Sequence, residues 1–164
     1  MLRKKNISKA PFRAGGRSII PIKSLKIEDG FHLLITIRVN GKPARLLIDT
    51  GASKTVFDKE MIVKFLSKEK FEKHDKLSTG LGTGNMKSHL AVIGKISIGK
   101  TEIKNYKTVV IDLSHVNKAY KHMKQKPIDG VLGSDILKEY GAIINYGKAL
   151  LLLYPKKSPV NNKA

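Results

Sequence analysis

Residues 46–53 read Leu-Leu-Ile-Asp-Thr-Gly-Ala-Ser and carry an apolar run directly into a turn that holds one carboxylate. The run Leu46–Ile48 is typical of the end of a buried strand. Gly51 adopts backbone conformations that other residues resist, so the chain can turn closely beside Asp49. Asp-Thr-Gly occurs once in the 164 residues. A reaction that needs two facing aspartates of this kind would therefore take the second from another chain.

The composition indicates one folded domain without cysteine chemistry. A chain of 164 residues, 41% of them hydrophobic, is long enough to bury a substantial core. The absence of cysteine excludes disulfides, thiolate nucleophiles and cysteine-ligated metals. No apolar segment reaches the length of a membrane span. No apolar signal core follows the basic start, so we expect a cytoplasmic protein.

Positive charge is concentrated toward the N-terminus. The formal net charge is +19, and residues 1–27 contain eight Lys and Arg and no acid. We expect this segment to be disordered, followed by a folded domain at 28–155 and a polar tail at 156–164. The charge indicates either attraction to nucleic acid or another polyanion, or a solubilising composition. A single aromatic residue, Phe12, lies among these basic residues and no recognised binding motif is present, which favours the second interpretation.

The pattern of apolar residues predicts a mainly β fold. Residues 31–39 and 42–48 read as strands on either side of Asn40-Gly41, the strongest short-range signal for a β-hairpin. Short helices are expected at 58–66 and from Ser134 or Asp135 to Tyr140. Residues 114–126 should form an exposed loop with some helix. Further strands are expected at residues 90–98, 101–103, 107–113, 142–145 and 149–154.

Two carboxylates that share a proton can hydrolyse a peptide bond. Held close together, they cannot both ionise at low cost, so one pKa rises, the other falls, and the pair titrates as a unit. The ionised group takes a proton from water while the protonated group polarises the peptide carbonyl. A turn that follows a rigid strand suits this chemistry, because backbone N–H groups there can orient the carboxylate. The alternative interpretation of Asp49 is an ordinary turn former.

Three segments, in order along the chain, resemble the retropepsin-like aspartic proteases, chiefly the bacterial and retroelement types. Residues 46–53, LLIDTGAS, resemble the active-site strand and turn of that family. Residues 79–84, TGLGTG, resemble the tip of its flap, and residues 129–137, DGVLGSDIL, resemble its apolar segment and short helix. The resemblance covers about residues 30–154. It implies an aspartic endopeptidase with a closed β-barrel, half of the acid-protease fold, that works as a homodimer and needs no metal or organic cofactor.

The resemblance also implies roles for individual residues. Asp49 would be the catalytic carboxylate. Thr50 and Gly51 would support its turn, and Thr50 would bond to its counterpart across the dimer. Val131, Leu132 and Gly133 would pack beneath the turn as structural support. A peptide or protein substrate would be bound by Gly51, Ala52, Ser53, Gly80, Leu81, Gly82, Thr83 and Gly84.

Three features depart from the family pattern. Ser53-Lys54 stands where many viral members carry acidic residues, so substrate contacts there should differ. The long basic segment 114–126 could shape a substrate cleft or be an inert insertion. The strand at 149–154 follows the strand at 142–145, so the last hairpin could build the dimer interface differently from the viral members, or cover it.

Other residues and other functions remain open. Asp129 and Asp135 are interpreted as turn or capping residues, because neither is followed by Thr or Ser and then Gly. The five histidines are scattered and lack metal-ligand spacing. Two further functions stand beside the protease: an inactive module of this fold that binds peptides or proteins, and a polyanion-binding protein led by residues 1–27.

Overall fold

The Asn40-Gly41 dipeptide makes the turn that delivers the chain to Asp49. The computed structural model describes residues 16–27, 30–66, 71–77 and 87–156. In it, β3 (Gly30–Val39) and β4 (Lys42–Ile48) pair in antiparallel register. Asn40 and Gly41 have positive φ angles of 48° and 83°, as a two-residue hairpin turn of this kind requires. The predicted hairpin is confirmed.

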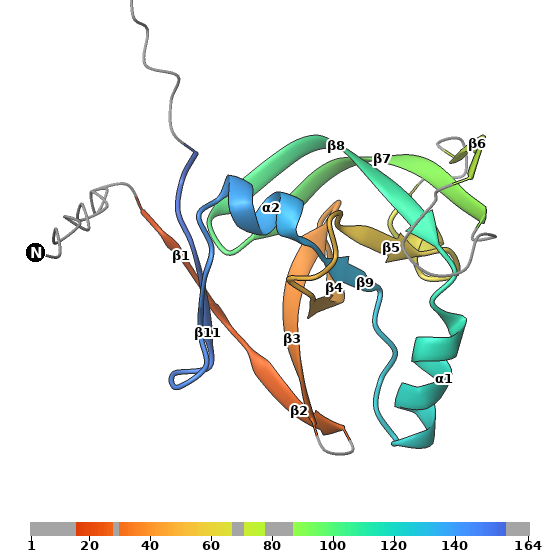
Figure 1. The fold of residues 1–164 in the computed structure, drawn as a ribbon. Coiled ribbons are helices and arrows are strands. Elements are labelled where there is room, and N and C mark those ends of the chain that lie inside the picture. Colours follow the sequence, from red (N-terminus) through yellow and green to blue (C-terminus); the bar gives the residue numbers. More distant parts are fainter. Residues whose placement is uncertain (1–15, 28–29, 67–70, 78–86, 157–164) are drawn as a thin grey trace, which may run out of the picture.

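Six strands close into a barrel (Figure 1). The strands that join β3 and β4 are β5 (Val56–Asp58), β7 (Lys87–Ile98), β8 (Thr101–Ile111) and β9 (Gly130–Leu132). Their order is β3-β4-β9-β5-β8-β7, and β7 pairs again with β3 where Val39 lies opposite Ile96. The sheet is extended at its two ends by β2 (Lys23–Ile27) and β6 (Phe71–Leu77). The predicted mainly β, closed-barrel fold is confirmed.

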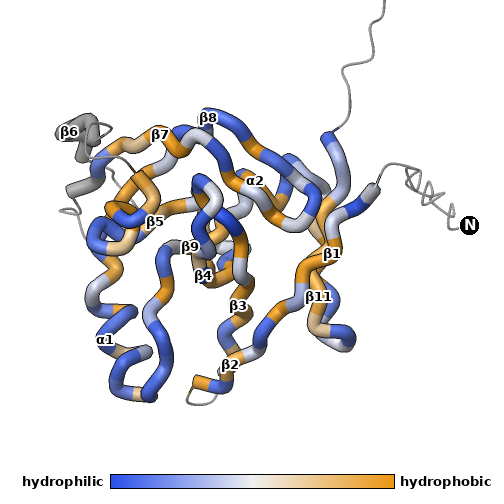
Figure 2. Tube along the Cα trace, turned by 180° about the vertical axis from the view of Figure 1, so that it is seen from behind, coloured by the Kyte–Doolittle hydropathy of each residue, from blue (hydrophilic) through white to orange (hydrophobic). Residues whose placement is uncertain are grey.

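Alternating side chains of the strands fill the barrel. In β3, Ile35, Ile37 and Val39 are buried, whereas Thr36 and Arg38 are exposed. Figure 2 shows the same alternation of hydrophobic and hydrophilic residues along the strands. Each large apolar side chain that is fully buried contributes about 1.5–3 kcal/mol. The barrel is therefore a stable frame for the loops that leave its strands.

A second sheet, of three strands, corrects the expectation for residues 1–27. β1 (Ser18–Pro21) pairs with β11 (Leu150–Leu153), which pairs on its other side with β10 (Ile143–Asn145). Ile20 and Ile22 are 4% and 7% exposed. Residues 18–27 thus form two strands, β1 and β2, and the boundary predicted at residue 27 was wrong. The alternating isoleucines among the basic residues indicated a strand, but the high positive charge led to the prediction of disorder. The expectations for residues 1–15 and 157–164 lie outside the described residues.

The helices are short, and two local predictions need correction. The helical elements are α1 (Ser114–His122), α2 (Ser134–Glu139) and the 3-10 turn η1 (Ile62–Lys64). The helix expected at 58–66 was wrong apart from η1, because the buried Asp58 carboxylate accepts the N–H groups of Glu60, Met61 and Leu113 and so favours a tight turn. The strands expected at 101–103 and 107–113 are the single strand β8. No helix among the described residues is long and apolar enough to cross a membrane.

Candidate active site

The turn after β4 holds the Asp49 carboxylate with backbone groups. The N–H of Gly51 donates to Asp49 Oδ1 at 2.9 Å. The N–H of Asp49 donates to the Leu132 carbonyl at 3.1 Å, and the N–H of Ala52 donates to the Asp49 carbonyl at 3.2 Å. The side chain of Asp49 is nevertheless exposed. The carboxylate is therefore oriented from behind and open to a ligand in front.

Strand β9 lies directly behind this turn. It runs parallel to β4, with Ile48 opposite Leu132, and antiparallel to β5 on its other side. The N–H of Ser134 donates to the Ala52 carbonyl at 2.7 Å. Val131 and Leu132 are buried. The structure thus brings residues 130–134 against residues 46–58, although the two segments are distant in sequence.

The glycine at 133 is required by close packing against the same turn. A Cβ at this position would lie 2.4 Å from the carbonyl carbon of Lys54 and 2.5 Å from its oxygen. Its φ and ψ are −94° and 177°, which any residue can adopt. The requirement for glycine is therefore steric and comes from the neighbouring backbone.

A hydrogen-bonded group beneath the turn was not foreseen from the sequence. Asp135 Oδ1 accepts both the N–H (2.9 Å) and the hydroxyl (2.8 Å) of Thr55, and its Oδ2 accepts the hydroxyl of Tyr106 at 2.5 Å. The Thr55 hydroxyl oxygen in turn accepts the N–H of Gly133 at 2.9 Å. Asp135 thus ties β5 and β8 to the start of α2, where the sequence suggested a helix cap. No local pattern marks this tie, because Thr55 and Asp135 are far apart along the chain.

The same hydrogen bonds shift two ionisation equilibria. Burial opposes ionisation of Asp135, but the bonds from Tyr106 and Thr55 outweigh it and lower the pKa of Asp135 below its usual value. Burial, and then the bond to Asp135, raise the pKa of the Tyr106 hydroxyl. Asp135 is therefore an anion that accepts these bonds at neutral pH.

We expect Asp135→Ala to destabilise the fold by about 2 kcal/mol, because it removes the acceptor of both Thr55 groups. Asp135→Asn keeps one oxygen acceptor and should lose less. The folded-state pKa is lowered, so the contribution of the charge is present above the unfolded pKa, about 3.9, and is lost as pH falls through the folded value. Thermal unfolding should therefore show a wild-type advantage over Asp135→Asn that shrinks in acid, and an equal advantage at all pH values would contradict this.

Asp129 is also engaged away from Asp49. It is 4% exposed, its Oδ2 accepts the N–H of Arg45 at 2.7 Å, and its Oδ1 pairs with the ammonium group of Lys64. A buried carboxylate with these partners is a structural group. Neither Asp129 nor Asp135 lines the surface beside Asp49.

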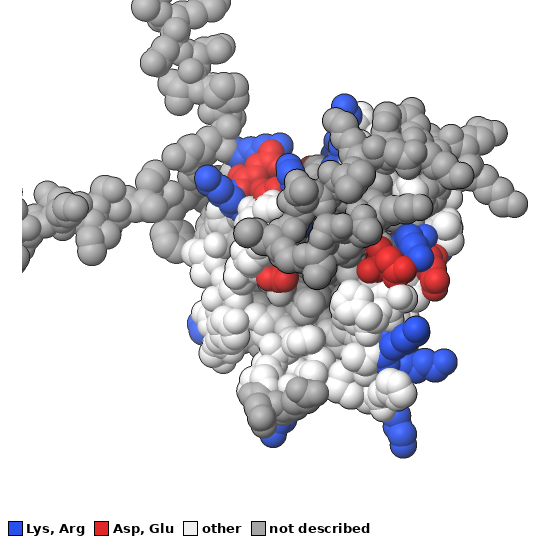
Figure 3. Space-filling model, turned by 45° about the vertical axis from the view of Figure 1, so that its right-hand side comes forward, with Lys and Arg blue, Asp and Glu red and all other residues white. Residues whose placement is uncertain are grey.

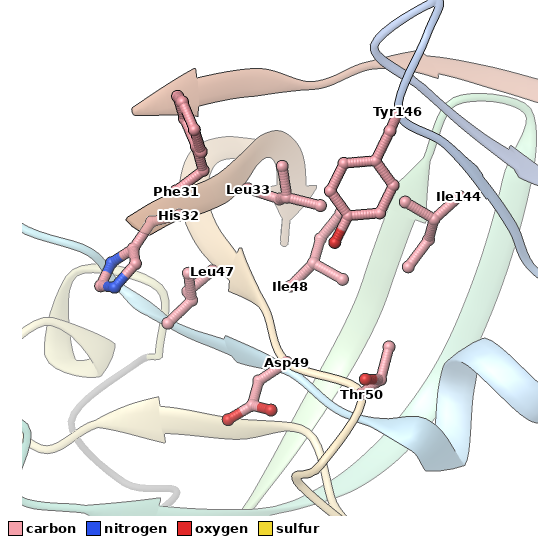
Figure 4. Close-up of a pocket in the computed structure, with 9 residues that line it drawn as sticks. All are labelled: Phe31, His32, Leu33, Leu47, Ile48, Asp49, Thr50, Ile144 and Tyr146. Atoms are coloured by element: carbon pink, nitrogen blue, oxygen red, sulfur yellow. The ribbon is translucent and has the colours of Figure 1, made fainter. Parts of the chain in front are cut away.

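A pocket of about 260 Å³ opens beside the turn. In Figure 4, Asp49 and Thr50 lie on one side of it, and Ile144 and Tyr146 lie on another. Asp49 is the one carboxylate among the described residues that line it. The complete lining consists of Phe31, His32, Leu33, Leu47, Ile48, Asp49, Thr50, Ile144 and Tyr146.

Helix α1 contacts a residue that lines this pocket. The Tyr120 hydroxyl, on a side chain that is 1% exposed, lies 2.7 Å from His32 Nδ1. The side chain of Asn117 bonds to both the N–H and the carbonyl of Ile128 and so holds α1 to the segment that leads into β9. Of the two interpretations of residues 114–126, these contacts favour a segment that supports the pocket wall.

The remaining sequence-predicted site residues are partly outside the described chain. Thr50 and Ser53 are exposed and Ala52 is half-buried, all on the turn after Asp49. Gly80, Leu81, Gly82, Thr83 and Gly84 lie outside the described residues. Among the residues that the structure describes, no three His, Asp or Glu side chains gather as metal ligands would.

Comparisons with known proteins agree with this geometry. Residues 35–136 match the family described as aspartyl protease. No curated protein matches the sequence. Among solved structures, the chain is similar to a retropepsin-like aspartic protease from Rickettsia conorii, with 25% identity and a TM-score of 0.53 over 85% of this chain and 91% of that one.

Two more distant structures share the fold. The EIAV protease, complexed with the inhibitor HBY-793, is 21% identical, with a TM-score of 0.52 over 74% of this chain and 99% of that one. The retroviral protease-like domain of Ddi1 from Leishmania major is 14% identical, with a TM-score of 0.52 over 79% of this chain and 97% of that one.

Proposed function

This chain belongs to the aspartyl protease family, and from that premise we propose that it is an aspartic endopeptidase that acts as a homodimer. The observation that carries the proposal is the state of Asp49. Its carboxylate is exposed beside a pocket, while the Gly51 N–H and the bond from Asp49 to β9 hold its turn in place. An exposed carboxylate with a restrained orientation is what a general base for water requires.

The homodimer is proposed because Asp49 is the one carboxylate among the described residues that line the pocket. Peptide hydrolysis of this kind needs one ionised and one protonated carboxylate on either side of a water molecule. Asp129 is bound to Lys64 and Arg45, and Asp135 to Thr55 and Tyr106. The second reacting group would therefore be Asp49 of another copy, with the two copies of Thr50 bonding across the twofold axis.

In the proposed reaction, the substrate peptide lies extended across the pair of turns. The ionised Asp49 accepts a proton from water as the water oxygen attacks the carbonyl carbon. The protonated Asp49 donates a hydrogen bond to the carbonyl oxygen and its proton to the developing oxyanion. As the tetrahedral intermediate collapses and the C–N bond breaks, the Asp49 that received the proton of water gives it to the leaving nitrogen, and the other Asp49 takes a proton back from a hydroxyl of the intermediate. No metal or organic cofactor takes part in these steps.

The proposal assigns substrate contacts to two segments. The backbone of Gly51 and residues Ala52 and Ser53 would bind the main chain of the peptide by β-type hydrogen bonds. Residues 80–84 would close over the substrate, as their resemblance to a flap implies. Lys54 follows Ser53 and is exposed, so substrates with an acidic side chain near the cleaved bond should be favoured.

A peptide that is cleaved by this protein should become an inhibitor when a hydroxyethylene group replaces its cleaved amide. The hydroxyl-bearing carbon mimics the tetrahedral intermediate and cannot collapse, so it should bind more tightly than the substrate, by about 10²-fold or more. The measurement is inhibition of cleavage of a peptide library, and the control is the methylene analogue, which has a CH2 group in place of the hydroxyl-bearing carbon. Activity should also fall on both sides of a pH optimum, since only the singly protonated pair is active.

The alternative to the protease is an inactive module of the same fold that binds peptides. It would be supported by a stable dimer that binds peptides but cleaves none between about pH 3 and pH 8, the range in which a shared carboxylate proton is expected. Equal binding of the hydroxyethylene and methylene analogues would also contradict the proposed mechanism.

A further inference from the structure

Strand β10 (Ile143–Asn145) has an open edge. It pairs with β11 on one side, and no described strand pairs with it on the other. Exposed strand edges are usually protected by lysine, proline or a bulge, because they otherwise pair with other chains. The outer strand β2 has lysines at 23 and 26, but β10 reads Ile-Ile-Asn and has no such protection.

Two hydrogen bonds fix which main-chain groups of β11 face β10. The N–H of Ile22 donates to the Ala149 carbonyl at 2.8 Å, on the side of β1. The N–H of Tyr154 donates to the Tyr140 carbonyl at 2.7 Å, on the side of β10. Main-chain groups alternate in direction along a strand. The odd-numbered residues of β11 therefore bond toward β1 and the even-numbered residues toward β10.

This alternation identifies the residue that is open on β10. Ile144 lies opposite Leu151, which bonds toward β1. In such a pair, both residues direct their N–H and C=O groups away from each other. Ile143 and Asn145, opposite Leu152 and Leu150, bond to β11. The open edge of β10 thus presents the N–H and the C=O of Ile144.

The side chains beside this edge belong to the Asp49 pocket. Ile144 and Tyr146 line the pocket together with Asp49 and Thr50 (Figure 4). Tyr146 is 74% exposed and Phe31, across the pocket, is 66% exposed. Large apolar groups gathered on one exposed surface mark an interaction site. The same surface is thus both apolar and adjacent to the carboxylate that needs a partner.

Charge restricts where two copies of this protein can meet. Each copy carries a net charge of +19, so contact through most of the surface would be repulsive. None of the residues that line the pocket is Lys or Arg. Figure 3 shows a broad uncharged area in the lower left part of one face, with Lys and Arg at its margins. A second copy of this chain can approach such an area without bringing lysines together.

We propose that β10 pairs in antiparallel fashion with β10 of a second copy, about a twofold axis at Ile144. The N–H of each Ile144 donates to the C=O of the partner's Ile144, and the two three-stranded sheets become one continuous sheet. Because β11 and β1 already pair with each other within one chain, the last hairpin stays in its own protomer, and no terminal strand is exchanged. This inference rests on the proposed function, which requires a second Asp49.

The test is the oligomeric state of the full chain with Ile144→Pro. Proline removes only the outward N–H, so the pairing of β10 with β11 loses no hydrogen bond. We expect the wild type to sediment as a dimer and Ile144→Pro as a monomer with a similar circular dichroism spectrum. Ile144→Val keeps the N–H and most of the apolar surface, and it should remain a dimer.

A second variant guards against loss of folding by the proline. Tyr146→Lys places a charge on a side chain that is exposed in the monomer, so folding should be preserved. Its dimer dissociation constant should rise by about 10-fold or more, because two like charges then face each other across the axis. Val63→Lys, at a 58% exposed position on η1, is the matched control and should dimerise like the wild type.

The results separate this inference from the proposed function. The β10 interface would be overturned if Ile144→Pro and Tyr146→Lys both dimerised with the same dissociation constant as the wild type. It would also be overturned if the wild type were strictly monomeric. If those two variants stay dimeric and cleave peptides, the protease stands and the β10 interface falls. If they become monomers while the dimeric wild type cleaves no peptide, the β10 interface stands and the protease falls.

Discussion

Asp49→Asn is expected to lower the rate of peptide cleavage by about 10³-fold or more, the largest effect of any single change. Asparagine has the shape of aspartate and keeps an oxygen that can accept the Gly51 N–H, so the turn should be preserved. It carries no charge and cannot take a proton from water. The measurement is kcat/KM on a cleaved peptide, with thermal unfolding as the check on folding.

The matched control is Glu102→Gln, which also replaces an exposed carboxylate by a neutral amide of the same shape. Glu102 lies in β8 and pairs with Lys95. It should leave cleavage unchanged. Equal rates for Asp49→Asn and the wild type would remove Asp49 from the mechanism.

Mixing the two proteins would test whether one site uses two chains. If each site needs two intact copies of Asp49, an equal mixture that has exchanged subunits keeps only about one quarter of its dimers fully wild type. Activity should then fall well below the half expected for independent sites. A strictly proportional loss would show that each chain works alone.

Gly133→Ala is expected to destabilise the fold by about 3 kcal/mol or more. The added Cβ would lie 2.4 Å from the Lys54 carbonyl carbon and 2.8 Å from the Thr55 nitrogen. These are backbone atoms, so relief requires the turn segment and α2 to separate, which would also break the bond from Gly133 N–H to Thr55. Chemical denaturation gives the free energy of unfolding directly.

Gly147→Ala is the control for this change. Its Cβ would lie 3.6 Å from Asn145 Oδ1, an ordinary contact, so stability should stay within about 0.5 kcal/mol of the wild type. Since the φ of Gly133 suits any residue, an equally small effect at Gly133 would mean that the backbone near Lys54 yields easily. Cleavage by folded Gly133→Ala should also drop, because the Asp49 turn would move.

Local signals in the sequence predicted local structure well. The Asn40-Gly41 turn needs only two residues with positive φ between two strands, and it is present as expected. The last hairpin and the helix after Gly133 were also expected from short patterns. Errors arose where a local pattern was ambiguous, as in the helix expected at 58–66, where the carboxylate of Asp58 turned out to close a tight turn.

The sequence by itself predicted the mainly β pattern and the hairpin at Asn40-Gly41, because these depend on short runs of neighbouring residues. Its resemblance to the retropepsin-like aspartic proteases implied the closed barrel and singled out Asp49. The tertiary structure alone decided what surrounds Asp49. Whether Asp135 caps a helix or ties Thr55, whether residues 18–27 form strands, and which edge of the last hairpin stays open all depend on partners about 80 or more residues away. Such contacts form only when the interactions of the folded chain outweigh the entropy lost in bringing distant segments together. A local sequence pattern contains no information about that difference.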